Sequence, residues 1–289
     1  MTSTTNSRFS ATTSKRQYDE AWWPSLSQSG LTILKLGGSV ITEKTHPLSA
    51  RPKVIDRIAR ELSSFGSELI LIHGAGSFGH PIVKKYGIGL GQGDFRRIGV
   101  SETKLALMEL NSLVVRALKN HKIPSVPFMP SCFMTAEEGR LTSMTINSLK
   151  RMLDTGYVPV LHGDLIPDSH WGVSVVSGDQ MAVQLAKDLK ASLVLFGCDV
   201  DGVFTSDPRL NRHAELVSQI RYSELQRWIA TVGGSTETDV TGGMRGKLVE
   251  TAKLADDQTN VIIFNLAKRG NLKRLLNDDR LDCTRIVHG

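Results

Sequence analysis

Residues 31–39 read LTILKLGGS and residues 68–80 read ELILIHGAGSFGH, and these two stretches set the pattern for the chain. Each begins with an apolar run of strand length and ends in a glycine-rich turn. Between them, Val54, Ile58 and Leu62 recur at helical spacing. A strand, a turn, a helix and a second strand in this order are typical of a parallel α/β sheet.

The same alternation continues to the end of the chain. Apolar spacing predicts helices over residues 96–120, 179–189 and 244–255. Short apolar runs predict strands over residues 123–128, 158–161, 192–198, 261–265 and 284–287. Residues 165–175 are expected to form a hairpin with its turn at Pro167–Ser169. With no internal repeat or linker, residues 31–289 are expected to form one α/β domain, a three-layer αβα sandwich with a mainly parallel central sheet.

The first residues differ in composition from the rest. Residues 1–17 contain nine Ser or Thr, three basic residues and no acidic residue, without apolar periodicity. We therefore expect residues 1–30 to be a flexible tail. The segment lacks the apolar region of a secretory signal, but both a plain extension and an organelle transit peptide fit its composition. A cytoplasmic location is the expectation, with organelle targeting left open.

Composition narrows the class of protein. An apolar content of 40% is ordinary for a globular chain, and no apolar run approaches the roughly 18 to 20 residues that span a bilayer. The three cysteines are far apart and form no CxxC pair, which argues against a disulfide framework or a zinc site. The net charge of +6 is interspersed, so it suits a pocket for a polyanionic small molecule as well as it suits nucleic acid.

Two common phosphate-binding motifs are disfavoured. Gly74, Gly76 and Gly79 satisfy GxGxxG after a strand, but a dinucleotide-binding unit also needs an acidic residue about 20 positions later at the end of a second strand. Asp94 lies instead in a glycine-rich loop. The motif GxxxxGK[ST] does not occur in the sequence. A phosphate would have to be held in another way.

Four glycine-bearing segments offer that alternative. They are KLGGS (35–39), HGAGSFGH (73–80), DVDGVF (199–204) and DVTGGMRGK (239–247). In a parallel sheet such turns open at the carboxyl edge of the strands, where ligands bind. Glycines let the backbone approach an anion, and helix N-termini supply free N–H groups. Together with Lys35, Lys44 and Lys247, these segments predict a polyanion site.

The same segments carry a family resemblance. KLGGS, SGDQ (177–180), DVDGVF and DVTGGM with a lysine three positions later resemble the amino acid kinase family, whose members phosphorylate carboxylates, carbamate or phosphates with ATP. HGAGSFGH followed by LHGD (161–164) resembles, within that family, the isopentenyl phosphate kinases. The resemblance implies ATP and Mg²⁺ as cofactors, isopentenyl phosphate as the substrate and a homodimer. It implies no nucleic-acid or membrane partner.

Site residues follow from the resemblance, position by position. The residues expected to bind ATP are Lys35, Leu36, Gly37, Gly38, Ser39, Gly76, Asp199, Gly202, Val203, Phe204, Gly243 and Lys247. The acceptor is expected to contact Ala75, His80 and Gly163. The residues expected to act in catalysis are Lys44, His80 and Asp179, and no protein side chains are expected to form a metal site.

The chemistry explains why these residue types are needed. Two unit charges of the same sign about 4 Å apart repel by roughly 4 kcal/mol at an effective dielectric near 20, so transfer between phosphates needs lysines and Mg²⁺. A buried Lys35 without an anionic partner would be expensive, whereas Lys44 could also be a solvated loop lysine. Asp179 either orients the ATP-binding lysines or caps a helix that begins at Gln180. His80 directly precedes Pro81, where a helix is expected to begin, and is expected to bind the acceptor phosphate.

Other side chains and other functions remain open. His73 and His162 are expected to be structural. An apolar cluster beside His80 could house a five-carbon tail, although core packing explains it equally well; it consists of Phe78, Ile82, Val83, Tyr86 and Ile88. A kinase for another small phosphate or phosphonate, fosfomycin included, would differ only around residues 75–88. A non-catalytic nucleotide-binding sensor would lack the lysines.

Overall fold

The computed structural model describes residues 30–289 apart from residues 67, 90–94, 209, 233–242 and 289. The expected tail therefore lies outside the described residues except for its last position. Asp94 and residues 239–242 of the fourth glycine segment lie outside them as well.

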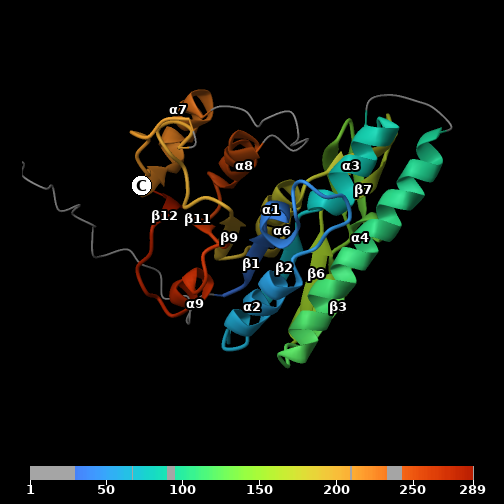
Figure 1. Ribbon diagram of the computed structural model, residues 1–289, viewed down its shortest axis with the longest axis horizontal. Coiled ribbons are helices and arrows are strands. Elements are labelled where there is room, and N and C mark those ends of the chain that lie inside the picture. The colour runs from blue at the N-terminus through green and yellow to red at the C-terminus, as the bar shows by residue number, and fades with distance from the viewer. Residues whose placement is uncertain (1–29, 67, 90–94, 209, 233–242, 289) are drawn as a thin grey trace, which may run out of the picture.

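The central sheet has eight strands in the order β10-β12-β11-β9-β1-β2-β6-β3 (Figure 1). Their bounds are β1 (Thr32–Leu36), β2 (Leu69–His73), β3 (Ser125–Pro127), β6 (Val158–His162), β9 (Leu193–Cys198), β10 (Gln219–Arg221), β11 (Asn260–Asn265) and β12 (Cys283–Val287). Every neighbouring pair is parallel except β11 and β12. The mainly parallel central sheet predicted from the sequence is confirmed.

Helices cover both faces of this sheet. Their bounds are α1 (Gly38–Ile41), α2 (Pro52–Leu62), α3 (Gly76–Tyr86), α4 (Phe95–Asn120), α5 (Asn147–Asp154), α6 (Gly178–Leu189), α7 (Leu225–Thr231), α8 (Gly243–Thr251) and α9 (Asn271–Leu276). Side chains alternate along β1, so Ile33 joins one core cluster with α5, α6 and α8, while Leu34 joins another with α2, α4 and α9. The three-layer αβα sandwich is confirmed.

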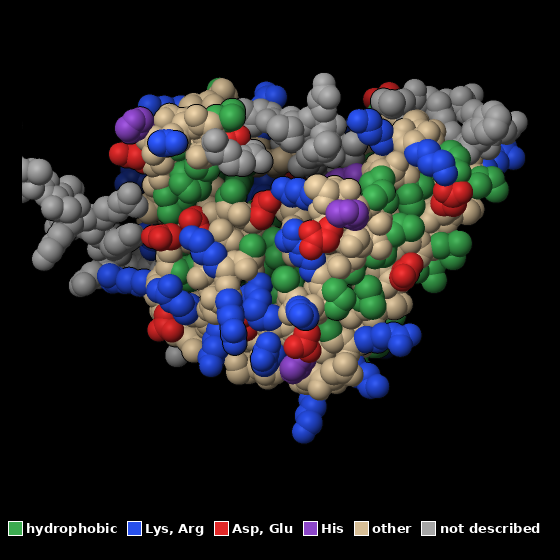
Figure 2. All heavy atoms as spheres, viewed as in Figure 1, with side chains coloured by type: hydrophobic (Ala, Val, Ile, Leu, Met, Phe, Trp, Pro, Cys, Tyr) green, Lys and Arg blue, Asp and Glu red, His purple; other side chains and the backbone are tan. Residues whose placement is uncertain are grey.

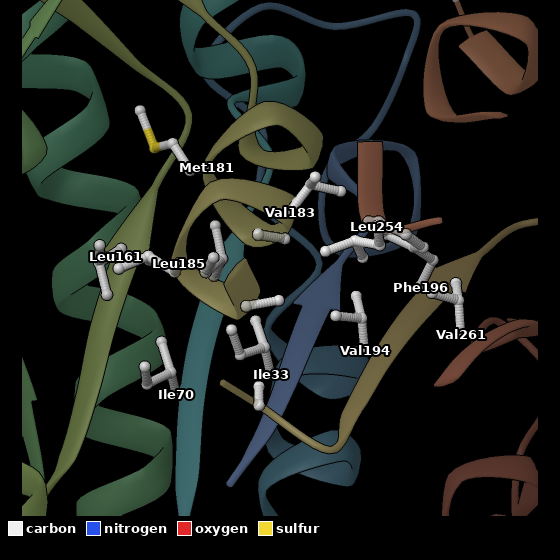
Figure 3. Close-up of a cluster of buried hydrophobic side chains, with 14 of the residues drawn as sticks. Ile33, Ile70, Leu161, Met181, Val183, Leu185, Val194, Phe196, Leu254 and Val261 are labelled. Atoms are coloured by element: carbon white, nitrogen blue, oxygen red, sulfur yellow. The ribbon is translucent and has the colours of Figure 1, made fainter. Parts of the chain in front are cut away.

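The first core cluster places α6 against the strands that lead to the site. Figure 3 shows Ile33, Ile70 and Val194 projecting from three strands toward Leu185 of α6, and all four side chains are almost inaccessible to solvent. Burying an aliphatic side chain of this size stabilises the fold by about 1.5 to 3 kcal/mol. The first turn of α6 is thereby fixed above the carboxyl ends of β1 and β2.

A second sheet of four strands was not expected from the sequence. Its order is β5-β4-β7-β8, with bounds β4 (Met134–Glu137), β5 (Arg140–Met144), β7 (Asp164–Asp168) and β8 (Gly172–Val176). Strands β4 and β5 were missed because they are short and rich in polar residues. Of the other unpredicted elements, β10 has three residues, and α5, α7 and α9 have six to eight each.

The hairpin predicted near residues 165–175 exists as β7 and β8, but its turn was misplaced. Pro167 pairs with Val173 inside the hairpin, so the turn comprises residues 169–171. The Asp168 carboxylate decides this, because it accepts hydrogen bonds from the backbone N–H groups of His170 (2.9 Å) and Trp171 (2.8 Å). The hydrogen bonds to the Asp168 carboxylate therefore fix the position of the turn, although Pro167 in the sequence had indicated a turn two residues earlier.

Within the described residues, none of the helices has both the length and the apolarity needed to cross a membrane.

Candidate active site

The glycine turns after β1 and β2 touch each other through their backbones. A Cβ atom on Gly38 would lie 2.6 Å from the Gly76 nitrogen, and one on Gly74 would lie 2.6 Å from the Gly38 nitrogen. The Gly74 N–H also donates to the Leu36 carbonyl at 2.9 Å. Only glycine permits this approach, which brings the N-termini of α1 and α3 together. Two glycine turns, each followed by a helix N-terminus, therefore lie side by side, an arrangement that suits an anion.

His80 lies in the second turn of α3 and is half-buried. The sequence placed it just before a helix beginning at Pro81, and that expectation was wrong because the helix begins at Gly76. Pro81 has no N–H, so the Ser77 carbonyl four residues earlier lacks its helical partner. That carbonyl accepts instead from the Leu48 N–H at 3.0 Å. The proline thus attaches a neighbouring loop to α3.

That loop carries Lys44. The Ser77 N–H donates to Thr42 Oγ1 at 3.0 Å, and Ser77 Oγ donates to the Ser49 carbonyl at 3.2 Å. Lys44 Nζ lies 2.8 Å from Asp199 Oδ2 at the end of β9, and both side chains are exposed to solvent. Exposed ion pairs contribute about 0 to 1 kcal/mol, so Lys44 can leave Asp199 for an incoming anion at little cost.

Asp199 is held in its ionised form. Burial opposes its ionisation, but the hydrogen bond and charge of Lys44, with a further hydrogen bond from Ser39, outweigh burial and lower the pKa of the carboxyl. The sequence predicted Asp199 and Ser39 for the nucleotide site, and the structure brings both next to Lys44.

One buried carboxylate holds two lysines. Lys35 Nζ lies 2.8 Å from Asp179 Oδ1, and Lys247 Nζ lies 2.9 Å from each of the Asp179 oxygens. The side chains are 13%, 5% and 7% exposed for Lys35, Lys247 and Asp179. Burial opposes ionisation of Asp179, but the charges of Lys247 and Lys35 outweigh it and lower its pKa well below the ordinary range. Two ammonium groups against one carboxylate make this group of three side chains net positive, which favours an anionic ligand.

The alternative role of Asp179 as a helix cap is wrong. The N-cap of α6 is Ser177, whose hydroxyl accepts a hydrogen bond from the Gln180 N–H at 3.1 Å. Asp179 lies in the first turn of the helix, where the positive end of the helix dipole further favours its charge. Its carboxylate is therefore available to both lysines.

The segment DVDGVF is fixed to β12. A Cβ atom on Gly202 would lie 2.3 Å from Thr284 Oγ1, and the Val203 N–H donates to the same hydroxyl at 2.7 Å. Val203 is fully buried in the core, and its carbonyl accepts from the Val217 N–H at 2.8 Å, so the structure leaves no part of this predicted ATP contact open to a ligand. Phe204 is half-buried. Gly243, also predicted for the ATP site, begins α8, the helix that carries Lys247.

Predicted acceptor contacts flank the end of β2. Ala75 is the N-cap of α3 and is half-buried. Gly163 follows β6, is buried, and donates its N–H to the His73 carbonyl at 2.9 Å. A Cβ atom on Gly163 would lie 3.2 Å from the Gly178 nitrogen, and one on Gly178 would lie 3.6 Å from Lys35 Cε. Gly178 therefore connects the acceptor side to Lys35.

His73 and His162 are buried structural residues, as expected. Their rings lie 5.5 Å apart, and their Nδ1 atoms lie 3.2 and 3.1 Å from the carbonyls of Gly74 and Gly163. The Asn111 amide nitrogen can only donate, so His73 Nε2, 3.1 Å away, accepts and His73 Nδ1 carries the proton. Burial is the main cause that lowers the pKa of His73 to about 3, and it lowers that of His162 too. These neutral rings stabilise the two turns.

Sequence reasoning missed a second buried ion pair. Lys104 Nζ of α4 lies 2.6 Å from Oδ2 of Asp164, the fully buried residue that follows Gly163. The Ser131 N–H donates to the same oxygen at 3.2 Å. The available signal was the seven-residue spacing of Lys104 and Asn111, which places both on one face of α4.

The apolar cluster beside His80 divides into two parts. Phe78 is fully buried in the main core and Ile82 packs against it, so core packing accounts for these two. Val83, Tyr86 and Ile88 belong to a separate small cluster with Leu165, between α3 and the β7–β8 hairpin. Of the predicted cluster, only Val83, Tyr86 and Ile88 therefore remain candidates to contact the apolar tail of an acceptor.

Comparisons with known proteins agree with this arrangement. The model of the amino acid kinase family matches residues 30–265. Isopentenyl phosphate kinase of Methanothermobacter thermautotrophicus is 39% identical, over 89% of this chain and 99% of its own length. Isopentenyl phosphate kinase of Arabidopsis thaliana is 32% identical, over 79% of this chain and 73% of its own. A crystal structure of isopentenyl phosphate kinase matches with a TM-score of 0.78 and 36% identity, covering 89% of this chain and all of that chain.

The buried neutral histidines predict a loss of stability on acidification. The unfolded chain protonates His73 near pH 6.5, whereas the folded protein resists protonation down to about pH 3. The stability from this group is therefore complete above about pH 6.5 and falls below it by at most about 1.4 kcal/mol per pH unit. His162 acts in the same direction. Urea unfolding at pH 7.5, 6.0 and 5.0 gives the free energy of unfolding at each pH, and hence its slope against pH.

The control separates His73 from the other titrating groups. His73→Gln is expected to flatten the slope between pH 6.5 and 5, whereas the same change at the exposed His213 leaves it unchanged. Equal slopes for His73→Gln and the wild type would contradict the assignment.

Proposed function

The chain belongs to the amino acid kinase family, and we propose that it transfers the γ-phosphoryl group of ATP to isopentenyl phosphate, giving isopentenyl diphosphate and ADP. The observation that carries this proposal is the pair of buried ammonium groups on Asp179, directly beside two N–H-rich turns. The similarity to isopentenyl phosphate kinases supports the choice of acceptor.

In the proposed reaction an oxygen of the acceptor phosphate attacks the γ-phosphorus, and the bond from that phosphorus to the β–γ bridging oxygen breaks. A phosphate monoester is largely ionised at pH 7, so the nucleophile needs no strong base. Lys35 and Lys247 would contact the ATP phosphates, and Lys44 would exchange Asp199 for the group in transfer. Positioning and charge neutralisation then account for the rate.

Magnesium is proposed to enter with the nucleotide. In the part of the chain that is described, no group of three or more His, Cys, Asp or Glu side chains could hold a metal ion. Mg²⁺ commonly binds through substrate phosphates, one or two carboxylates and water, and the partly exposed Asp199 carboxylate offers such an oxygen. The bound ion would neutralise negative charge on the phosphates.

We also propose that the protein is a homodimer that pairs through α4. Ile98, Leu105 and Met108 are 61%, 67% and 46% exposed, and their spacing places them along one side of the helix. Hydrophobic side chains gather over α4 at the right edge of the molecule in Figure 2. A second copy would cover this apolar surface, which is costly to leave in water.

The substrate proposal predicts a strong preference among acceptors. With MgATP, kcat/KM for isopentenyl phosphate should exceed that for unrelated phosphates, carboxylates and fosfomycin by at least about a hundredfold, because a second phosphate and an apolar tail must both fit. Product formation is measured by ³¹P NMR, with EDTA abolishing turnover. Equal rates with unrelated acceptors would refute the substrate, and faster turnover of fosfomycin would favour the alternative kinase.

The variant His80→Ala tests the proposed contact of His80 with the acceptor phosphate, separately from ATP binding. Loss of a donor to the acceptor phosphate should lower kcat/KM for isopentenyl phosphate by about 10² to 10³, while the affinity for an ATP analogue stays within about twofold. Calorimetry measures the affinity. The matched control is His121→Ala, because His121 pairs with Asp56 outside the site. A large loss of nucleotide affinity in the His80 variant would contradict the assigned role.

Light scattering after size exclusion tests the dimer. The wild type should have twice the chain mass of 31.7 kDa, and Leu105→Glu with Met108→Glu should produce monomer, because two carboxylates cannot be buried in an apolar contact. Leu210→Glu is the control, since Leu210 is 87% exposed and belongs to the segment between β9 and β10, not to α4. A monomeric wild type, or dimer retained by the double variant, would exclude this interface.

A further inference from the structure

An ion pair connects the small sheet to the helix that carries Lys247. Arg140 on β5 donates from both terminal nitrogens to Glu250 on α8, at 2.6 and 2.8 Å. The Glu250 side chain is only 8% exposed, whereas that of Arg140 is 48% exposed. A two-pronged contact between a planar guanidinium and a carboxylate fixes orientation as well as distance.

Glu250 lies one helical turn after Lys247. Lys247 Nζ contacts Asp179 and lies 4.3 Å from the centroid of the Phe196 ring. Residues three apart on a helix move together, so the contact between Arg140 and Glu250 limits rotation and sliding of the turn that presents Lys247. Helix α8 is thus held at two points, by α6 through Asp179 and by β5 through Arg140.

The turn that presents Arg140 is itself rigid. Glu138 and Gly139 have φ values of 47° and 78°, the left-handed pair of a tight hairpin turn. The Asp168 carboxylate of β7 accepts from both of their N–H groups, at 3.2 and 2.9 Å. Burial opposes the ionisation of Asp168, but backbone N–H donors, that of Gly139 among them, outweigh it and lower its pKa.

The same turn is also attached to α6. Gln180, the neighbour of Asp179, accepts from the Leu141 N–H at 2.7 Å and donates to the Gly139 carbonyl at 3.2 Å. The residues on either side of Arg140 are therefore fixed to the helix turn that carries Asp179. Because β7 begins directly after Gly163, this turn also belongs to the sheet on the acceptor side.

We propose that Arg140 is a positioning residue for Lys247: through Glu250 it sets the height and rotation of α8, so that the ammonium group of Lys247 faces the ATP phosphates. Arg140 does not touch the reacting atoms. The reaction it serves is the one proposed above, but its effect on nucleotide binding is measurable without any acceptor.

Lys253 provides a matched control. Its Nζ lies 2.9 Å from Glu250 Oε2, but it is only three residues from Glu250 along the same helical segment. Lys253→Met removes a positive charge from Glu250 and leaves the contact to β5 intact. Arg140→Met removes a positive charge from the same carboxylate and also removes the contact between the sheet and the helix. Comparing the two variants therefore separates the effect of losing a positive charge beside Glu250 from the effect of losing the contact between β5 and α8.

The experiment measures steady-state kinetics for both substrates, and calorimetric affinity for a non-hydrolysable ATP analogue with Mg²⁺. Arg140→Met is expected to raise the KM for MgATP and weaken analogue binding about tenfold or more, because small displacements of a binding group are costly in rate and affinity. KM for isopentenyl phosphate should stay within about twofold. For KM of MgATP and for analogue affinity, Arg140→Lys should give values between those of the wild type and Arg140→Met. Glu250→Gln should change both quantities as much as Arg140→Met does. Lys253→Met should leave both within about threefold of the wild-type values.

A purely structural role gives a different result. Partial unfolding lowers the active fraction, so kcat would fall for both substrates with both KM values unchanged. That result, or a Lys253→Met defect equal to that of Arg140→Met, would overturn the proposal. If Arg140→Met does not fold, Arg140→Lys and Glu250→Gln decide by the same criteria. Wild-type protein that binds the ATP analogue but does not phosphorylate isopentenyl phosphate would refute the proposed function and leave the analogue-binding test of Arg140 valid.

Discussion

Two ammonium groups share one buried carboxylate, and the rest of the site depends on that contact. Lys35 is the penultimate residue of β1, Asp179 lies in the first turn of α6 and Lys247 lies on α8, so these three side chains connect three elements near the carboxyl edge of the sheet. The carboxylate offsets only one of the two charges. A buried excess charge is costly unless a ligand offsets it, and a polyanion such as a nucleotide phosphate does so.

A second constraint is steric. The turns after β1 and β2 approach so closely that a Cβ atom on Gly38 or Gly74 would collide with the opposing backbone. The two turns therefore lie side by side, and Lys35 lies just before the first of them in the sequence. The buried histidines His73 and His162 contact carbonyls of the turns that follow β2 and β6, and the loop bonded to Ser77 carries Lys44, which pairs with Asp199. Charge and backbone donors thus converge without a phosphate loop of the common kind.

The two sheets contribute different residues to the site. The eight-stranded sheet carries Lys35, whereas the four-stranded sheet begins directly after Gly163 and contacts α8, the helix of Lys247, through Arg140. The residues proposed for the nucleotide lie on the eight-stranded sheet and the segments that follow its strands, whereas Gly163, proposed for the acceptor, lies between β6 of that sheet and β7 of the four-stranded sheet.

The sequence by itself determined the parallel sheet, the glycine turns and the lysines at strand and helix ends, because periodicity and turn chemistry are local properties. Tertiary structure decided the rest. Cap and ion-pair roles for Asp179 give the same local signal; the structure separates them, because Ser177 caps α6 and Asp179 pairs with Lys35 and Lys247, which are distant in sequence. The α3 helix begins before Pro81 because a distant Leu48 N–H satisfies the carbonyl that the proline leaves free. Strands β4 and β5 have few apolar residues, so their sequence alone does not predict them. Their turn is held instead by Asp168, Gln180 and Glu250, which are remote in sequence.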